Sequence, residues 1–356
     1  MTDDRGGKNI TGYCDPLSLR AGEDISLMAS SHVPCPARLD LVRIVCGDAS
    51  TSGPGFCEHE VPSELPDVVD LQEQQTSLGS YGEVDLGRIG KAKRIAIRVH
   101  VLPTRPALEQ AILSVVTDDG SVLEIGTAAN QFVLRLGPTA IVLRDQPISA
   151  ARWYEIKLEI PLVPNEVITW VVIPLMTRSP GRDLTEPPSP HHGSAAYKRG
   201  ATGKFSQCLF ANSPDGSRFD GRIARPEIEF DDVVIRWDFS RDIKGRRLVD
   251  VSGHECHGVV HQLPTRGVTG PDWDGSAQSW MVMPSHYDAI HFHSDDLYDA
   301  EWKRTAYLTL PTQLESGIYA FRLRSEAGED RIPFFVRPAV GARTADVALL
   351  MSSCTY

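Results

Sequence analysis

The feature of this sequence that most restricts its fold is the near absence of helical periodicity. Short runs that alternate apolar and polar residues recur between turn signals, which is typical of β-sandwiches and β-barrels. The runs are densest from residue 93 onward and include "KRIAIRVHVLP", "QAILSVVTDDGSVLEIG" and "EVITWVVIPL". The "TDDG" at 117–120 separates two alternating segments, as a hairpin turn would. We therefore expect an all-β fold.

The length of 356 residues favours two or three domains over a single core. The early strand-like runs at 24–31 and 37–46 are too few to close a sandwich, and the hairpin at 317–338 has few partners near it in sequence. The economical arrangement pairs these two parts with each other. We expect an Ig-like β-sandwich built from residues 1–90 and 284–340, interrupted by a jelly roll at 91–283.

The C-terminal stretch differs in character from the rest. "ADVALLMS" is a nearly continuous apolar run, which is typical of a strand in a parallel sheet covered on both faces. We expect residues 341–356 to begin a truncated α/β domain with its first strand, so the chain is interpreted as a fragment. Cys354 follows this strand, and a structural role is the simpler expectation for a lone cysteine.

Charge and cysteine usage exclude several classes of function. A net charge of −11 argues against non-specific binding to nucleic acid or to an anionic membrane. No apolar run approaches the roughly 18 residues that span a bilayer, and the acidic start has no secretory signal. The seven cysteines include no CxxC pair, which favours free thiols in the cytoplasm, with a disulfide framework among Cys14–Cys57 as the alternative.

A cluster of possible metal ligands lies in "DVSGHECHGVVHQLPTRGVTGPDWDG", which holds His254, Cys256, His257 and His261. Its glycines and valines indicate a turn followed by a strand. On a strand, His257 and His261 lie about 13 Å apart, too far to share one zinc ion. We expect this segment to serve in turn and cross-strand hydrogen bonding, not in metal binding.

A better spacing for metal binding occurs in "HYDAIHFHSDDLYDAEW". On a strand, His291 and His293 point to one side about 6.6 Å apart, and Asp295 and Asp296 follow them. The two histidines are therefore candidate metal ligands or catalytic groups. The simpler alternative is a polar strand end that makes an interdomain contact.

Other motifs are absent or weak. The sequence has no GxSxG, no GxGxxG and no Walker A motif. Residues 176–205, rich in proline, glycine and serine, are expected to form an exposed loop, with its two adjacent histidines solvated. Aromatic residues at strand spacing are usually core, with a sugar-binding platform as the alternative; the tryptophans concerned are Trp153, Trp170, Trp237, Trp273 and Trp280.

Several strings together resemble one enzyme family. "RFDGRIARPEIEF", "VVIRWDFSRDI" and the 250–275 segment resemble the concanavalin-A-like (laminin-G-like) jelly roll of the large (beta) subunit of N,N-dimethylformamidase. "AIHFHSDDLYDAEW", "LPTQLESGIYAFRLRSEAGEDRIPFFVRP" and "DVALLMSSCTY" extend the resemblance into its Ig-like module and the first strand of its catalytic domain. The match is strongest from about residue 200 onward.

The resemblance implies an amidohydrolase that converts N,N-dimethylformamide to dimethylamine and formate. It implies a mononuclear iron(III) bound by two tyrosines and a glutamate, a ligand set that suits a hard Lewis acid. It further implies association with a small (alpha) helical subunit and with other large subunits. Relatives acting on other small amides would share this framework, so the sequence does not select the amide.

The family's iron-site residues cannot be assigned to positions of this sequence, because the family's catalytic domain is far longer than the stretch after Val340. Tyr356 is a candidate iron ligand, but we expect no catalytic residue and no bound iron in this chain. The leading interpretation is a structural, inactive part of a large subunit. The rivals are a free-standing lectin-like carbohydrate-binding module and a self-sufficient hydrolase that uses His291 and His293.

Overall fold

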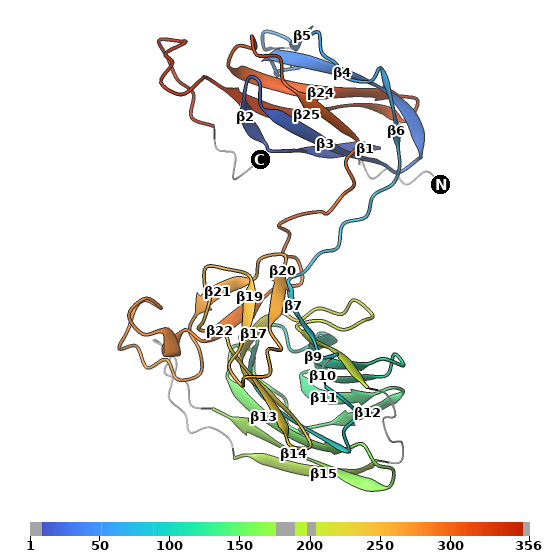
Figure 1. The fold of residues 1–356 in the computed structure, drawn as a ribbon, viewed down its shortest axis with the longest axis vertical. Helices are drawn as coiled ribbons and strands as arrows, with labels where there is room; N and C mark the ends of the chain where they lie inside the picture. Colours follow the sequence, from blue (N-terminus) through green and yellow to red (C-terminus); the bar gives the residue numbers. More distant parts are fainter. Residues whose placement is uncertain (1–8, 51, 88, 176–188, 198–203, 352–356) are drawn as a thin grey trace. The chain divides into compact units, whose positions relative to one another are not determined.

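The computed structural model describes residues 9–50, 52–87, 89–175, 189–197 and 204–351. The chain forms two compact units, one from Met1–Thr76 with Ala300–Tyr356 and the other from Ser77–Asp299. Both are built almost wholly of strands (Figure 1), and the 3₁₀ turn Pro284–His286 is the one helical element within the described ranges. The expected all-β class is confirmed.

The first unit is a β-sandwich whose two sheets combine strands from both ends of the chain. Its core lies between the sheets and includes Leu27, Leu41, Phe321 and Phe334, all less than 2% exposed. Leu27 belongs to the smaller sheet, of three antiparallel strands: β1 (Ile10–Asp15), β3 (Asp24–Ser31) and β23 (Ala306–Thr309). The larger sheet contains β2 (Ser18–Arg20), β25 (Gly328–Arg337), β24 (Gly317–Ser325), β4 (Cys35–Cys46) and β5 (Cys57–Glu60), with β6 (Val68–Leu71) also paired to β4.

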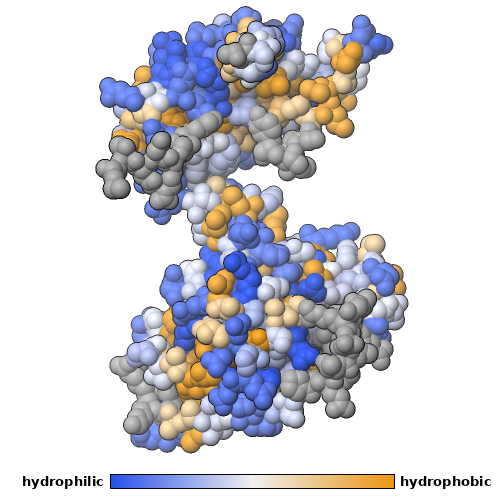
Figure 2. All heavy atoms as spheres, turned by 180° about the vertical axis from the view of Figure 1, so that it is seen from behind, coloured by the Kyte–Doolittle hydropathy of each residue, from blue (hydrophilic) through white to orange (hydrophobic). Residues whose placement is uncertain are grey.

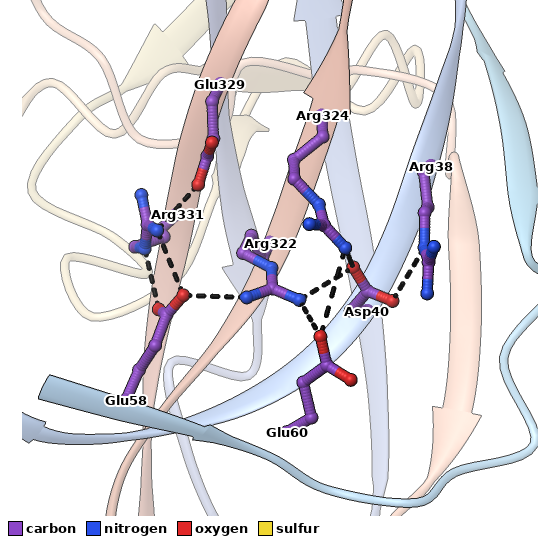
Figure 3. Close-up of polar contacts among 8 residues, drawn as sticks. All are labelled: Arg38, Asp40, Glu58, Glu60, Arg322, Arg324, Glu329 and Arg331. Carbon is purple, nitrogen blue, oxygen red and sulfur yellow. Dashed lines mark hydrogen bonds and ion pairs between the residues drawn. The ribbon is translucent and has the colours of Figure 1, made fainter.

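The outer face of the larger sheet carries an ion network (Figure 3), because strand alternation turns charged side chains away from the core. Arg322 lies at its centre, with its side chain 9% exposed. Its Nη1 donates to Glu58 at 2.8 Å, and its Nη2 donates to Asp40 at 3.0 Å and to Glu60. Arg331 Nε also donates to Glu58, at 2.7 Å. Such cross-strand pairs help fix the register of β5, β4, β24 and β25.

The second unit is a larger two-layered sandwich. One layer holds β7 (Tyr81–Asp85), β9 (Gln110–Thr117), β10 (Val122–Ala128), β11 (Gln131–Leu136), β12 (Thr139–Val142), β16 (Phe205–Phe210) and β20 (Gly258–His261). The other holds β8 (Arg94–Pro103), β13 (Tyr154–Pro161), β14 (Glu166–Pro174), β15 (His191–Tyr197), β17 (Gly221–Phe230), β18 (Val233–Asp238), β21 (Thr265–Val268) and β22 (Ala289–Phe292). β19 (Arg247–Asp250) pairs with both β18 and β20, so the layers form one nearly closed sheet.

β8 illustrates how the sequence builds this sandwich. Ile95, Ile97 and Val99 point into the core and are at most 2% exposed, whereas Arg98 between them is half exposed. This period of two places alternate residues on opposite faces of the sheet. The inward residues join one continuous core, and the outward residues form a charged face beside β17 and β18.

The boundaries between the units differ from the expected ones. The sequence predicted 1–90 and 284–340 for the interrupted sandwich, but residues 77–90 and 284–299 lie in the second unit. The reason is long-range strand pairing: β7 pairs with β16 and β20, and β22 pairs with β17 and β21. Local patterns do not reveal which distant strand a short segment joins.

A second difference concerns the stretch expected to be an exposed loop at 176–205. Residues His191–Tyr197 form β15, which pairs antiparallel with β14 from Val172↔His191 to Glu166↔Tyr197. The flanking residues 176–188 and 198–203 lie outside the described part of the chain. Pairing with an edge strand compensates for the low β propensity of small residues such as "GSAA".

The expected strand at the C-terminus is not present over residues 341–351. Val347, Leu349 and Leu350 are 85%, 78% and 96% exposed. Figure 2 shows hydrophobic residues on the surface of the first unit, to which this segment belongs. A strand of a covered parallel sheet needs neighbouring strands and helices, and no described strand pairs with this segment. Cys354 and Tyr356 lie outside the described residues.

Two further properties bear on the expectations from composition. The six described cysteines are free thiols, among them Cys14 and Cys57. In the described ranges, no helix is long and apolar enough to cross a membrane.

Candidate functional site

The 250–257 segment is a hydrogen-bonded turn, as predicted. The Asp250 backbone N–H donates to His257 Nδ1 at 3.0 Å. The Asp250 carboxylate in turn accepts the backbone N–H groups of Cys256 at 3.0 Å and Ser252 at 2.7 Å. One aspartate thus satisfies two backbone donors of the loop, as short polar side chains in turns often do.

His261 lies apart from that turn, on β20. Its Nε2 lies 3.0 Å from Glu83 Oε2, and its ring stacks on Tyr81 with centroids 4.4 Å apart. Arg218 lies over the Tyr81 ring, with its Cζ 4.7 Å from the ring centroid. These contacts are the cross-strand role expected of His261.

His291 and His293 are brought side by side, with ring centroids 4.1 Å apart. Burial lowers the pKa of His291 to about 4, so this imidazole is neutral at pH 7. His293 Nδ1 lies 3.3 Å from Asp296 Oδ2, which also accepts the Ser80 hydroxyl at 2.6 Å. Across the described residues, no group of three or more His, Cys, Asp or Glu side chains could hold a metal ion. A catalytic or metal-binding role for the pair stays a prediction.

Three buried tyrosines bear on the iron ligands that the family resemblance implies. The Tyr287 hydroxyl donates to the Ala277 carbonyl at 3.0 Å, and the Tyr319 hydroxyl donates to the Glu315 carbonyl at 2.9 Å. The Tyr154 hydroxyl accepts a backbone N–H at 2.8 Å. These phenols are committed to the backbone, so they do not fit a phenolate–carboxylate iron site.

The tryptophans are mostly core residues, as expected. Trp153, Trp170 and Trp237 are 3%, 7% and 2% exposed, and the last two donate their indole N–H to backbone carbonyls. Trp273 and Trp280 are half-buried on the loop before Pro284–His286. The five tryptophans therefore do not form a sugar-binding platform together.

A cleft of about 480 Å³ opens on the charged face of the second unit, which sequence reasoning missed. Strands β8, β17 and β18 supply much of its lining, and loops complete it. The residues that define its chemistry are Arg98, His100, Arg225, Glu227, Arg236 and Asp288. A fixed strand framework holds most of these side chains, which favours a preformed site.

A β-bulge in β17 shapes this cleft. The register against β8 shifts between Ala224 and Glu227, and Arg225 adopts φ +48°. Pro226 explains the bulge, because proline has no N–H to donate to the ladder. Arg225 lines the cleft as a result. The proline within "RIARPEIEF" was the local signal that could have drawn attention to this site.

Arg225 is bound between two acids. Its Nε donates to Asp288, and its Nη1 lies 2.7 Å from Asp272 Oδ2. Burial raises the pKa of Asp288, which is 6% exposed, and Arg225 acts in the opposite direction. Burial also disfavours the charge on Arg225, but the two carboxylates outweigh it and raise the pKa of the guanidinium.

His100 and Glu155 form the second buried pair near the cleft. His100 is 6% exposed, and burial lowers its pKa to about 4, so its ring is neutral at pH 7. His100 Nε2 lies 3.8 Å from Glu155 Oε1, which also accepts the Arg98 Nε–H at 2.5 Å. Burial opposes the charge on Glu155, but Arg98 outweighs it and lowers the pKa of this carboxyl.

Comparison with known proteins gives two kinds of match. Residues 265–356 match a family described as N,N-dimethylformamidase beta subunit-like, C-terminal. The N,N-dimethylformamidase beta subunit of an Alcaligenes species is 29% identical over 395 residues, which include 98% of this chain. The same subunit of Paracoccus aminophilus is 30% identical over 393 residues, again with 98% of this chain.

The chain is similar in sequence to N,N-dimethylformamidase beta subunits over almost its whole length. The resemblance seen in the sequence is confirmed, and it extends over both units. The chain spans 51% of the length of each of these two relatives.

Among solved structures, a putative carbohydrate-binding protein from Bacteroides ovatus is similar over 71% of this chain and 91% of its own. The sequences are 9% identical and the TM-score is 0.35. A similarity of this size indicates nothing about a shared ligand.

Proposed function

We propose that this chain is the framework part of the large subunit of an amidohydrolase. The whole enzyme would hydrolyse N,N-dimethylformamide, or a related small amide, to dimethylamine and formate. The observation that carries the proposal is the relation to dimethylformamidase beta subunits over 98% of this chain. The beta-subunit name of these relatives supports the presence of other subunits in the whole enzyme. A small alpha subunit, further large subunits and a cytoplasmic location are part of the proposal.

The proposed role of this part is structural. Its two sandwiches have separate cores, which suit it to present a catalytic part and to make subunit contacts. Mononuclear iron(III) belongs to the proposal for the whole enzyme, where it would act as a Lewis acid. Because the buried tyrosines are committed to the backbone, we assign no iron ligand to them. We propose that the chain 1–356 alone has no hydrolase activity.

The test compares the 356-residue chain with the protein purified from its native source, whose intact mass gives the true length of the polypeptide. Both are incubated with N,N-dimethylformamide, N-methylformamide and acetamide, and released amine and carboxylate are quantified. We expect turnover and stoichiometric iron in the native protein and neither in the isolated chain. A native protein that hydrolyses none of these amides would overturn the proposal.

The rival hydrolase interpretation rests on His291 and His293, and the same assay decides it. Turnover by the isolated chain that disappears in the His291→Ala/His293→Ala double variant would favour that rival. The lectin-like alternative has a specific observation in its favour, namely the polar cleft on β8, β17 and β18.

A further inference from the structure

We propose that the cleft on β8, β17 and β18 binds a neutral, polyhydroxylated small molecule of the saccharide class. The inference concerns the second unit by itself and does not depend on amide hydrolysis. It rests on the size of the cleft, its charge balance, and the hydrogen-bonding groups that its lining leaves unused.

The cleft has the size of a small-molecule site. Its volume of about 480 Å³ falls within the roughly 300–1,000 Å³ typical of ligand pockets. The strand residues on its walls are held by the β8–β17 and β17–β18 ladders. A ligand would therefore meet groups that are already in position, which reduces the entropy lost on binding.

The lining has no excess of either charge. Three arginines, Arg98, Arg225 and Arg236, are matched by three carboxylates, those of Glu227, Asp238 and Asp288. Arg236 donates to Glu227 and Arg225 donates to Asp288, so these charges compensate one another locally. A balanced lining attracts neither anions nor cations strongly. This favours a neutral ligand over a phosphate, a sugar acid or an amine.

Two buried acceptors in the lining have no hydrogen-bond partner among the described residues. They are His100 Nδ1 and Asp288 Oδ1. Glu155 faces His100 Nε2, which favours the proton on that nitrogen and leaves Nδ1 as an acceptor. Both atoms are shielded from solvent, so the lining side chains must shift before a donor on the ligand can reach them; such a bond would recover the free energy that an unpaired buried acceptor costs. A fully ionised group without hydroxyls, such as a carboxylate, only accepts and cannot supply such a donor.

Donors are also available at the rim. Arg98 and Arg236 bind their carboxylates through Nε, and their side chains are 50% and 56% exposed. A guanidinium has five N–H groups, so each arginine retains donors for an acceptor on the ligand. Hydroxyl groups donate and accept at once, and a sugar ring carries several of them. This combination of fixed donors and acceptors is what a saccharide satisfies.

Calorimetric titration of the 356-residue chain tests the proposal. The probes are glucose, galactose, mannose and maltose, with glucuronate and glucosamine as charged analogues and N,N-dimethylformamide as a small-amide comparison. We expect at least one neutral sugar to bind with a Kd of about 1 mM or tighter, and its charged analogues about tenfold more weakly. No binding by any neutral sugar, or tighter binding by glucuronate or glucosamine, would overturn the proposal.

Three variants locate the site. Asp288→Asn replaces one of the two carboxylate oxygens by an amide donor, and His100→Phe removes the Nδ1 acceptor. Arg236→Gln replaces the half-exposed guanidinium by a shorter amide with fewer donors, a change that should not affect folding. We expect each to weaken binding by about fivefold or more, since one hydrogen bond is lost. His261→Gln is the matched control, because this histidine also pairs with a glutamate but lies outside the cleft lining.

The control should bind sugar as the unaltered chain does. Arg236→Gln that retains full affinity in a chain with an unchanged melting temperature would refute the assignment of the site. Equal loss in His261→Gln would refute it as well. Amide hydrolysis by the native protein is unaffected by any of these outcomes, so the two proposals fail separately.

Discussion

Arg322 Nη2 lies 3.0 Å from Asp40 Oδ2, although the two residues are 282 positions apart in the sequence. This pair joins β24 to β4 and thus connects the two chain segments that build the first unit. Figure 3 shows that Glu58 and Glu60 approach the same guanidinium from β5. One arginine therefore pairs with three carboxylates on two neighbouring strands, and Arg324 and Arg331 supply further positive charge to them.

Replacing Arg322 by methionine should destabilise the first unit. The change leaves Asp40 and Glu58, both less than 15% exposed at the side chain, without their shared cation. Loss of one partner that leaves a buried charge unpaired costs about 3 kcal/mol or more of unfolding free energy. Because Arg324 and Arg331 still pair with these two carboxylates, we expect a loss of about 1–3 kcal/mol. Hydrogen exchange of β24 peptides, measured by mass spectrometry, reports on this unit separately from the other.

Arg324→Met provides the matched control. Arg324 also donates to Asp40, at 2.6 Å, but its side chain is 36% exposed. Solvent screens such a pair, so the loss should be below about 1 kcal/mol. Equal destabilisation by the two substitutions would show that burial does not set the strength of this network.

The ion network should also make the first unit sensitive to acid. Burial opposes ionisation of Asp40, but Arg322 and Arg324 outweigh it and lower the pKa of this carboxyl. Arg331 and Arg322 outweigh burial at Glu58 and lower its pKa in the same way. In the unfolded chain such groups titrate near about 3.9 and 4.3. The stabilisation is therefore complete above about pH 5 and is lost as pH falls through the lower folded values.

Urea unfolding followed between pH 7 and pH 2.5 measures this dependence in the first unit. The Arg322→Met variant, in which the pKa values return toward ordinary ones, should lose less stability on acidification than the unaltered chain. A variant with an undiminished pH slope would contradict the assignment of these two carboxyls.

The sequence predicts the fold class but not which strands meet. Alternation in "KRIAIRVHVLP" indicates one buried and one exposed face of β8, and the structure has both. The pairing of β7 with β20, about 170 residues later, depends on long-range packing that no local pattern encodes. For this reason the domain boundaries were displaced although the strands themselves were predicted.

The cleft on β8, β17 and β18 likewise combines a feature that the sequence indicates with a contact that it does not. Pro226 within a β-like run indicates an irregularity, but the meeting of Arg225 with Asp288 depends on β22 pairing with β17. His291 and His293 could be placed together because both belong to one strand end, where spacing alone decides proximity. Proximity within a strand can be predicted from sequence, whereas convergence between strands cannot.

The second unit should lose stability in a different pH range, because it buries neutral histidines. The pKa of His100 and that of His291 are each lowered by burial to about 4, below the ordinary value of about 6.5. The unfolded chain therefore binds protons first as the pH falls. The stabilisation is full above about pH 6.5 and declines toward about pH 4.

The double variant His100→Phe/His291→Phe tests this range. Its hydrogen-exchange protection at β17 and β22 should change less between pH 7 and pH 5 than that of the unaltered chain. The His261→Gln control should retain the original pH slope, since the prediction rests on His100 and His291 alone. An equal slope in all three proteins would contradict the role of buried histidines.

Gly270 determines whether Asp288 can occupy its position beside Arg225. A Cβ at residue 270 would lie 1.8 Å from Asp288 Oδ1, so Gly270→Ala must displace that carboxylate. We expect a loss of about 1–3 kcal/mol, as for other overpacked sites, together with weakened sugar binding at the cleft. Gly90→Ala is the control, because nothing lies within 4 Å of a Cβ there. If Gly270→Ala binds and unfolds as Gly90→Ala does, Asp288 does not need this position, and its contribution to the cleft is refuted.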